Sequence, residues 1–345
     1  MTNKIIIKQP LTFRKVAITS FGMCCILFFV VIVALVIGTA EISLNQIIGI
    51  LMGRIAEDDP VRLIIFRIRL PRILLAGAVG FALSLGGVVF QAILRNPLAD
   101  PFILGVSSGS AFGAVLAIYW GLSFSLGVPI LSFVGALITI SLVMSLGARR
   151  MGMESSTILL TGVIINAFFT AIIMFFISTS SDDRLHTMLF WLYGDLSQSD
   201  YSQLTIVMFF VLASALVLYR FSKELNLITA GEENALQLGV EVKRTKIIGL
   251  LTVSLCMGLV VAFSGLIGFV GLIVPHLARM GFRSDHRMLI PVASIGGAIF
   301  LITADTLART VISPNELPVG VITAFLGAPF FIYLLKAKGS KWNQF

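Results

Sequence analysis

The sequence predicts an all-α membrane protein of about ten transmembrane helices. Hydrophobic residues make up 57% of the 345 residues and charged residues only 12%, with a mean hydropathy of +1.01. Soluble chains are about 45–50% apolar. Apolar runs near the ~20 residues that cross ~30 Å of hydrocarbon as a helix recur along the chain, whereas the short alternating segments of a membrane β-barrel do not.

The apolar runs predict ten spans, and one junction between them is ambiguous. Its sequence, AFSGLIGFVGLIVP (262–275), is apolar throughout, so periodicity does not locate a turn and a nine-span fold with one broken helix stays open. The expected spans are residues 16–38, 70–93, 102–120, 126–148, 156–178, 203–220, 245–264, 266–282, 288–308 and 319–335.

The distribution of basic residues predicts that both termini are cytoplasmic. With the N-terminus inside, the inside segments hold 18 of the 25 Lys and Arg residues, as the positive-inside rule requires. The basic N-terminal stretch resembles a signal peptide, but the apolar run after it is longer than the 7–15 residues of a signal core. We therefore interpret it as the first span.

The polar intervals are too short to form a soluble domain, so we expect one transmembrane permease domain over residues 1–345. The longest, at 39–69, 179–202 and 221–244, have 31, 24 and 24 residues. No P-loop of the form GxxxxGK[ST] is present in the sequence. We expect the net charge of +8 to serve orientation and contact with lipid headgroups rather than nucleic-acid binding.

Small residues recur three or four apart in GAVGFALSLGG (77–87) and GVSSGSAFGA (105–114). Such spacing lets helix backbones approach closely in lipid. Close packing is the simpler interpretation; the alternative is a pathway lined by Ser107, Ser108 and Ser110.

One acidic residue, Asp305, lies well inside a predicted span, and Arg309 follows four residues later. The two side chains share a helix face and can neutralise each other. An Asp at the bilayer centre costs about 2.5–3.5 kcal/mol on insertion scales, so this pair is a functional candidate. A proton-coupled carrier usually needs several such carboxylates, which counts against that class.

The segment RIRLPR (67–72) lies just before the second span on the outside. Its arginines can snorkel at the membrane interface. Guanidinium groups also bind carboxylates with two hydrogen bonds, so an acidic partner outside is the alternative.

The inside loop RNPLADPF (95–102) holds two prolines after polar residues. It predicts a tight turn, either a plain connector or part of a gate.

The candidate metal ligands lack metal-binding spacing. His276 lies three residues before Arg279 in PHLAR, and we interpret it as an interfacial hydrogen-bonding residue. Cys24, Cys25 and Cys256 lie in apolar runs without metal or disulfide spacing and are interpreted as small packing residues. We expect no metal and no cofactor on this chain.

A polar island, GEENALQLGVEVKR (231–244), interrupts the apolar runs on the predicted inside. Thr229 and Glu232 match a capping box and Gly239 a helix stop, which predicts a short helix over about 230–238. Two turns of helix are marginal in water alone. The island is either a solvated linker or a docking surface with Ala235, Leu236 and Leu238 as its apolar contact set.

These residues together resemble the FecCD-type permeases of ABC importers, which serve ferric siderophores, haem and cobalamin. The resemblance runs from RIRLPRILLAGAVGFALSLGGVVFQAILRNPLADPFILGVSSGSAFGA through GEENALQLGV and GFVGLIVPHLAR to TADTLARTVISPNELPVGVITAFLGAPFFIYLL. It implies ten helices in two inverted repeats, as in cobalamin permeases, and two permease subunits around one pathway. It also implies two separate ATPase subunits that carry ATP and magnesium, and an extracytoplasmic substrate-binding protein.

The resemblance also implies roles for single residues. The coupling helix that enters the ATPase would include Glu232, Ala235, Leu236, Leu238 and Gly239. Docking of the binding protein would use Arg69, Arg72 and Arg309, with Asp305 orienting Arg309. The cytoplasmic gate would include Asn96, Leu98, Ser155 and Ser156.

The resemblance therefore predicts a non-catalytic permease subunit of an ATP-driven importer in the bacterial cytoplasmic (inner) membrane. The expected substrate is an iron complex, a ferric siderophore first, with haem and cobalamin as alternatives. The rival class is a proton-coupled secondary transporter that uses Asp305.

Overall fold

The computed structural model describes residues 11–40, 42–52, 56, 59–148, 155–282 and 284–338, and these residues form helices and no strand. A π-helix, η1 (Ile64–Arg69), runs directly into α4, and a 3₁₀ turn, η2 (Pro101–Leu104), precedes α5. The α-helices are α1 (Phe13–Val36), α2 (Leu44–Leu51), α3 (Pro60–Leu63), α4 (Leu70–Ile93), α5 (Val106–Tyr119), α6 (Gly127–Ala148), α7 (Ser155–Ser178), α8 (Asp182–Leu192), α9 (Tyr201–Arg220), α10 (Ser222–Ala230), α11 (Glu232–Gln237), α12 (Val242–Ser264), α13 (Val270–Phe282), α14 (His286–Thr310) and α15 (Val319–Lys338).

The described helices confirm the predicted all-α membrane fold. Seven of them are long and apolar enough to cross a bilayer, and α5, α13 and α15 contain shorter apolar helical segments. In chain order these ten helices match the ten predicted spans. Two helices begin four residues later than predicted: α5 at Val106 rather than 102, and α13 at Val270 rather than 266. With 13 residues, α13 is only about 20 Å long.

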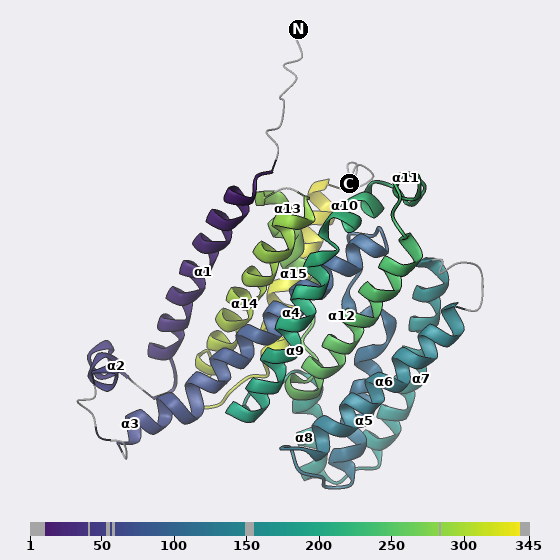
Figure 1. Cartoon of the computed structure of the whole chain (residues 1–345). Helices are drawn as coiled ribbons and strands as arrows, with labels where there is room; N and C mark the ends of the chain where they lie inside the picture. Colours follow the sequence, from purple (N-terminus) through teal and green to yellow (C-terminus); the bar gives the residue numbers. More distant parts are fainter. Residues whose placement is uncertain are drawn as a thin grey trace.

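The short helices mark the two ends of the bundle. Figure 1 shows α10 and α11 at the same end as the start of α1 and the end of α15, which we call the inner end. The helices α2, α3 and α8 lie at the opposite, outer end. The predicted arrangement, with the polar island and both terminal helices on one side, agrees with this layout.

The ambiguous junction is a break between two helices. The chain leaves α12 at Gly265, with φ +66°, and enters α13 after Phe269, with φ +69°. Asp195 donates its backbone N–H to the Ser264 carbonyl oxygen at 2.9 Å. Irregular backbone at membrane depth is stable only where other protein segments surround it, and here the segment between α8 and α9 supplies that contact.

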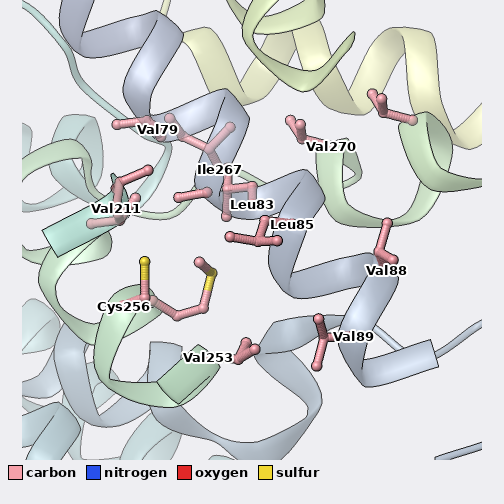
Figure 2. Packing of buried hydrophobic residues seen from close by; sticks show 14 of the residues in the cluster. Val79, Leu83, Leu85, Val88, Val89, Val211, Val253, Cys256, Ile267 and Val270 are labelled. Carbon is pink, nitrogen blue, oxygen red and sulfur yellow. The ribbon is translucent and has the colours of Figure 1, made fainter. Parts of the chain in front are cut away.

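The core of the bundle surrounds α4, which packs against α14, α12, α13 and α9. Figure 2 shows Leu85 and Val89 of α4 on the side that faces Val253 and Cys256 of α12. Cys256 is 4% exposed, which agrees with its interpretation as a packing residue.

Glycines bring α4 against two neighbouring helices. A Cβ atom on Gly80 would collide with the carbonyl oxygen of Gly297 in α14, and one on Gly87 would collide with that of Gly271 in α13. Such backbone contact is the main source of helix association in lipid, where no hydrophobic driving force acts between helices. The close packing predicted for residues 77–87 is confirmed.

The small residues of α5 make the same kind of contact with α6. A Cβ atom on Gly113 would collide with the Leu131 carbonyl oxygen. Ser110 lies 2.9 Å from Ser132 between hydroxyl oxygens, and the Ser108 hydroxyl donates to the Gly105 carbonyl at 2.8 Å. Since Ser107 is buried as well, the serines support close packing rather than a pathway lining within this chain.

Candidate functional site

A buried ion-pair cluster joins α4 to α14 near the outer end. Arg72 of α4 donates from Nε and Nη2 to Asp305 Oδ1 at 3.1 and 3.0 Å. Its Nη1 donates to Glu316 Oε2 at 2.7 Å. Asp305 is 1% exposed, so its charge depends on these partners: a buried carboxylate without compensation is very costly.

Arg309 completes the cluster from the other side of Asp305. Its Nε lies 3.1 Å from Asp305 Oδ2, which confirms the predicted pair four residues apart on one helix. The N–H is not aligned for a hydrogen bond to a described residue, so this contact is ionic. Arg309 Nη2 lies 3.3 Å from the Thr306 hydroxyl.

Arg69 has a different role from its neighbour Arg72. It lies at the end of the π-helix and points to the last turn of α1, where Nη1 donates to the Leu35 carbonyl at 2.7 Å and to the Val36 carbonyl at 3.2 Å. Its Nη2 donates to the Ala40 carbonyl. The last carbonyls of a helix have no partner inside the helix and carry partial negative charge, so Arg69 caps α1.

The three arginines that the resemblance assigns to docking of the binding protein are all buried in this chain, and their docking role stays a prediction. Arg69, Arg72 and Arg309 are 3%, 7% and 4% exposed. Their guanidinium groups bind carbonyls and carboxylates of this chain, because the end of α1, the start of α4 and the last turns of α14 meet at the outer end of the bundle. Within RIRLPR, the arginine whose side chain is exposed is Arg67.

The polar island at the inner end forms the short helix α11. Its predicted capping box is wrong: Thr229 belongs to the last turn of α10, where its hydroxyl donates to the Leu225 carbonyl at 2.7 Å. Gly231, with φ +139°, separates the two helices and is the N-cap of α11. The island therefore holds a helix–glycine–helix corner rather than one capped helix.

The predicted helix stop at Gly239 is confirmed. Gly239 has φ +82° and its N–H donates to the Leu236 carbonyl at 3.0 Å, while the N–H of Val240 donates to the Ala235 carbonyl at 3.0 Å. These two bonds form a Schellman motif, in which glycine adopts the left-handed conformation without a Cβ penalty.

The side chains of α11 divide into anchors and exposed contacts. Ala235 is fully buried against Ile228 and Val242, and Glu232 binds the 4% exposed Lys246 at 2.6 Å. Ala235 therefore anchors α11 to the bundle, and its predicted part in coupling to the ATPase stays a prediction. Leu236 and Leu238 are 59% and 68% exposed.

A groove of about 470 Å³ lies beside the exposed Leu236. Its lining combines apolar residues with charges from the start of α12, namely Leu236, Glu241, Val242, Lys243, Arg244, Ile247 and Ile248. An apolar patch rimmed by charge on a water-facing surface is typical of a protein contact site.

The inner loop between α4 and η2 is a rigid turn, as its prolines predict. Asn96 Oδ1 accepts from the Leu98 N–H at 2.9 Å and Asp100 Oδ1 accepts from the Phe102 N–H at 2.8 Å. Burial raises the pKa of the Asp100 carboxyl to about 6. Leu98 is 41% exposed, so one apolar side chain projects from an ordered loop.

The remaining gate candidates, Ser155 and Ser156, lie in the first turn of α7. Their side chains are outside the described part of the structure. The preceding segment, residues 149–154, is outside it as well.

Sequence reasoning missed three features of these regions. It did not pair Arg72 with Asp305, which is 233 residues away in the chain, or Lys246 with Glu232. It grouped Arg67 with its buried neighbours. The exposure of Arg67 could have been inferred only from helical spacing, because residues two apart, such as Arg67 and Arg69, lie on different faces of a helix.

Comparisons with known proteins place the chain in a family. The model of the FecCD transport family matches residues 26–337. The cobalamin import system permease protein BtuC of Halobacterium salinarum is 41% identical over 81% of this chain and 74% of its own length. The hemin transport system permease protein HmuU of Yersinia pestis is 38% identical over 89% of this chain and 93% of its own.

A solved structure supports the same assignment. It is described as an inward-facing conformation of a metal-chelate type ABC transporter, and superposes with a TM-score of 0.83 at 33% identity over 93% of this chain and 99% of the other. Agreement of sequence and fold over most of the length excludes a match confined to one motif. The chain therefore belongs to the FecCD transport family and is an ABC importer permease that crosses the membrane several times.

Proposed function

We propose that this chain is the permease subunit of an ATP-driven importer that moves an iron complex, a ferric siderophore first, into the cytoplasm. Two copies would enclose one pathway in the cytoplasmic (inner) membrane of a bacterium. Two ATPase subunits would bind ATP and magnesium, and an extracytoplasmic binding protein would deliver the substrate. The relatives named for cobalamin and hemin make those two molecules the alternative substrates.

The observation that carries the proposal is the surface of α11. A six-residue helix is too short to be stable by itself, yet it is anchored by buried Ala235 and by the Lys246–Glu232 ion pair. It presents Leu236 and Leu238 to water at the inner end. A rigid projection with exposed leucines is suited to enter a cleft of an ATPase subunit.

This division of roles selects the variants for a test. Leu238→Asp places a charge on the contact surface and leaves the anchors intact, whereas Leu238→Met is the matched control that keeps an apolar side chain. We expect Leu238→Asp to abolish co-purification with the ATPase and ATP-driven uptake, and Leu238→Met to retain both. Ala235→Asp is unsuitable, because a carboxylate at a fully buried position destabilises the fold itself.

For docking of the binding protein we propose Arg67 as the primary contact. It is the exposed arginine of RIRLPR at the outer end, where an acidic partner surface meets it first. Arg72 and Arg309 contribute through the shape and charge of the ion-pair cluster, and Arg69 contributes by holding the end of α1 beside it.

The proton-coupled alternative depends on Asp305. That carboxylate is bound by Arg72 and faces Arg309 at 3.1 Å, so both of its oxygens are engaged. Uptake into proteoliposomes decides between the classes: the proposal requires the ATPase subunit and ATP, and uptake driven by a proton gradient without an ATPase would overturn it. Binding of ferric siderophores, haem and cobalamin by the associated binding protein identifies the substrate.

A further inference from the structure

A cavity of about 510 Å³ lies at the inner end, apart from the groove beside α11. This volume is within the range of small-molecule sites. Its walls come from the end of α4, from α10, from α13 and from the start of α14, and its polar lining includes Gln91, Arg95, Thr229, His276, Arg279 and His286.

Three buried polar atoms in this wall have no hydrogen-bond partner among the residues that the structure describes. They are Arg279 Nη1, Gln91 Oε1 and His286 Nε2. Gln91 is 3% exposed and His286 2% exposed. A buried polar group without a partner costs about 1–3 kcal/mol, and more if charged, so the wall is built to bind something polar.

The hydrogen-bond network fixes which of these atoms donate and which accept. Gln91 donates its Nε2 to the Gly271 carbonyl at 3.3 Å, which leaves Oε1 as an acceptor. Asn226 donates its Nδ2 to Asp285 at 2.9 Å, so its Oδ1 accepts from His286 Nδ1 at 2.7 Å. A neutral His286 with its proton on Nδ1 presents Nε2 as an acceptor.

The cations of the cavity supply donors. Arg279 offers Nη1, and Arg95 lines the cavity from the end of α4. Arg95 adopts φ +51° in a Schellman motif, with the Asn96 N–H donating to the Gln91 carbonyl at 3.2 Å. Glycine is the usual residue at this position, and a side chain in the left-handed region costs roughly 1–2 kcal/mol. Arg95 therefore occupies a position at which glycine would be less strained.

We propose that this cavity binds an oxyanion that also carries a hydrogen-bond donor, as a monohydrogen phosphate group does. Arg279 and Arg95 bind the anionic oxygens, and Gln91 Oε1 and His286 Nε2 accept from the protonated group. The same chemistry is found in free phosphate and in phospholipid headgroups whose hydroxyl or ammonium group supplies the donor. The site does not depend on which substrate the permease transports.

Phosphate and sulfate test the acceptors directly. Both are tetrahedral oxyanions, but sulfate carries no proton at pH 7. We expect inorganic phosphate to raise the thermal midpoint of the purified full-length chain in a neutral detergent in a saturable way, and sulfate at equal ionic strength to have at least tenfold weaker affinity. Equal affinity for the two anions would overturn the proposal.

Variants locate the site. We expect Arg279→Gln to weaken phosphate binding about tenfold or more, and Gln91→Met to abolish the preference for phosphate over sulfate. Arg220→Gln is the matched control, because that side chain lies on α9 with 80% exposure and loses the same charge. If Arg279→Gln does not fold, Arg95→Gly is measured in its place, since glycine suits the left-handed backbone. Phosphate affinity that is unchanged in the arginine variant that folds refutes the site.

Lipid retention distinguishes the two sources of the ligand. Native mass spectrometry of the protein purified from membranes is expected to detect phosphatidylglycerol or phosphatidylethanolamine if a headgroup occupies the cavity, with loss in Arg95→Gly but not in Arg220→Gln. A phosphate response without retained lipid assigns the site to free phosphate. If phosphate causes no stabilisation and no lipid is lost in the cavity variant, the proposal is wrong.

Discussion

Replacement of Asp305 by asparagine removes the central charge of the buried cluster without changing its shape. Asp305 is 1% exposed, binds Arg72 at 3.0 Å and lies 3.1 Å from Arg309. Charges about 4 Å apart attract by about 4 kcal/mol at an effective dielectric constant near 20. In the variant the two buried guanidinium groups, those of Arg72 and Arg309, share Glu316 as the carboxylate that remains in the cluster.

The expected loss of stability follows from that imbalance. Removal of one partner from a buried ion pair destabilises proteins by about 3–5 kcal/mol. In thermal unfolding of the detergent-solubilised chain this corresponds to a drop of the midpoint on the order of 10 °C. Glu316→Gln removes the same charge from the same Arg72, but that side chain is 37% exposed, so we expect about 1 kcal/mol or less.

The comparison of these two variants is the measurement that matters. Equal small shifts would refute the reasoning, because they would mean that burial of Asp305 does not increase its contribution. A double variant, Asp305→Asn with Arg309→Gln, provides a further check. It is expected to be more stable than Asp305→Asn alone, since one uncompensated cation has been removed.

Three further predictions concern other parts of the chain. Gly87→Ala places a Cβ against the Gly271 carbonyl oxygen and is expected to destabilise the bundle by at least about 1–3 kcal/mol, measured by thermal unfolding with the exposed Gly22→Ala as control. Asp100→Asn keeps an acceptor for the Phe102 N–H and is expected to stabilise the fold at pH 7.5. Because the pKa of Asp100 in the folded state is raised to about 6, the free energy of unfolding of the wild type falls by up to about 3 kcal/mol as pH rises from 4 to 6. A variant whose stability has the same pH profile as the wild type would contradict this. Arg67→Glu is expected to weaken capture of the binding protein in a salt-dependent way, as measured by equilibrium binding at two salt concentrations, and Arg67→Lys serves as the charge-matched control.

Helix number and order could be predicted because hydrophobic length is a local property. The limits of α4 agree with the expected 70–93, since its apolar run ends at Arg95 and Asn96. The start of α13 could not be predicted, because Gly265 to Phe269 is as apolar as the helices beside it. Its break is determined by backbone hydrogen bonds and packing with residues 191–195 and 319–320, far away in the sequence.

The candidate residues were identified more reliably than their environments. Motifs drew attention to RIRLPR, TADTLAR and the polar island, and each forms part of an ordered site. Whether an arginine faces solvent or a neighbouring helix depends on tertiary packing, which cannot be read from the local sequence around it. Arg69 and Arg72 lie inward because the ends of α1 and α14 offer carbonyls and a carboxylate there.

The glycine contacts of α4 also limit how the protein can move. With its backbone in direct contact with α14 at Gly80 and with α13 at Gly87, α4 has no room to rotate or slide past either helix. We therefore expect the three helices to move together as one rigid body. Arg72 lies at the outer end of this rigid body and Leu98 in the turn at its inner end, so we expect a displacement at one face of the membrane to move the other face with it.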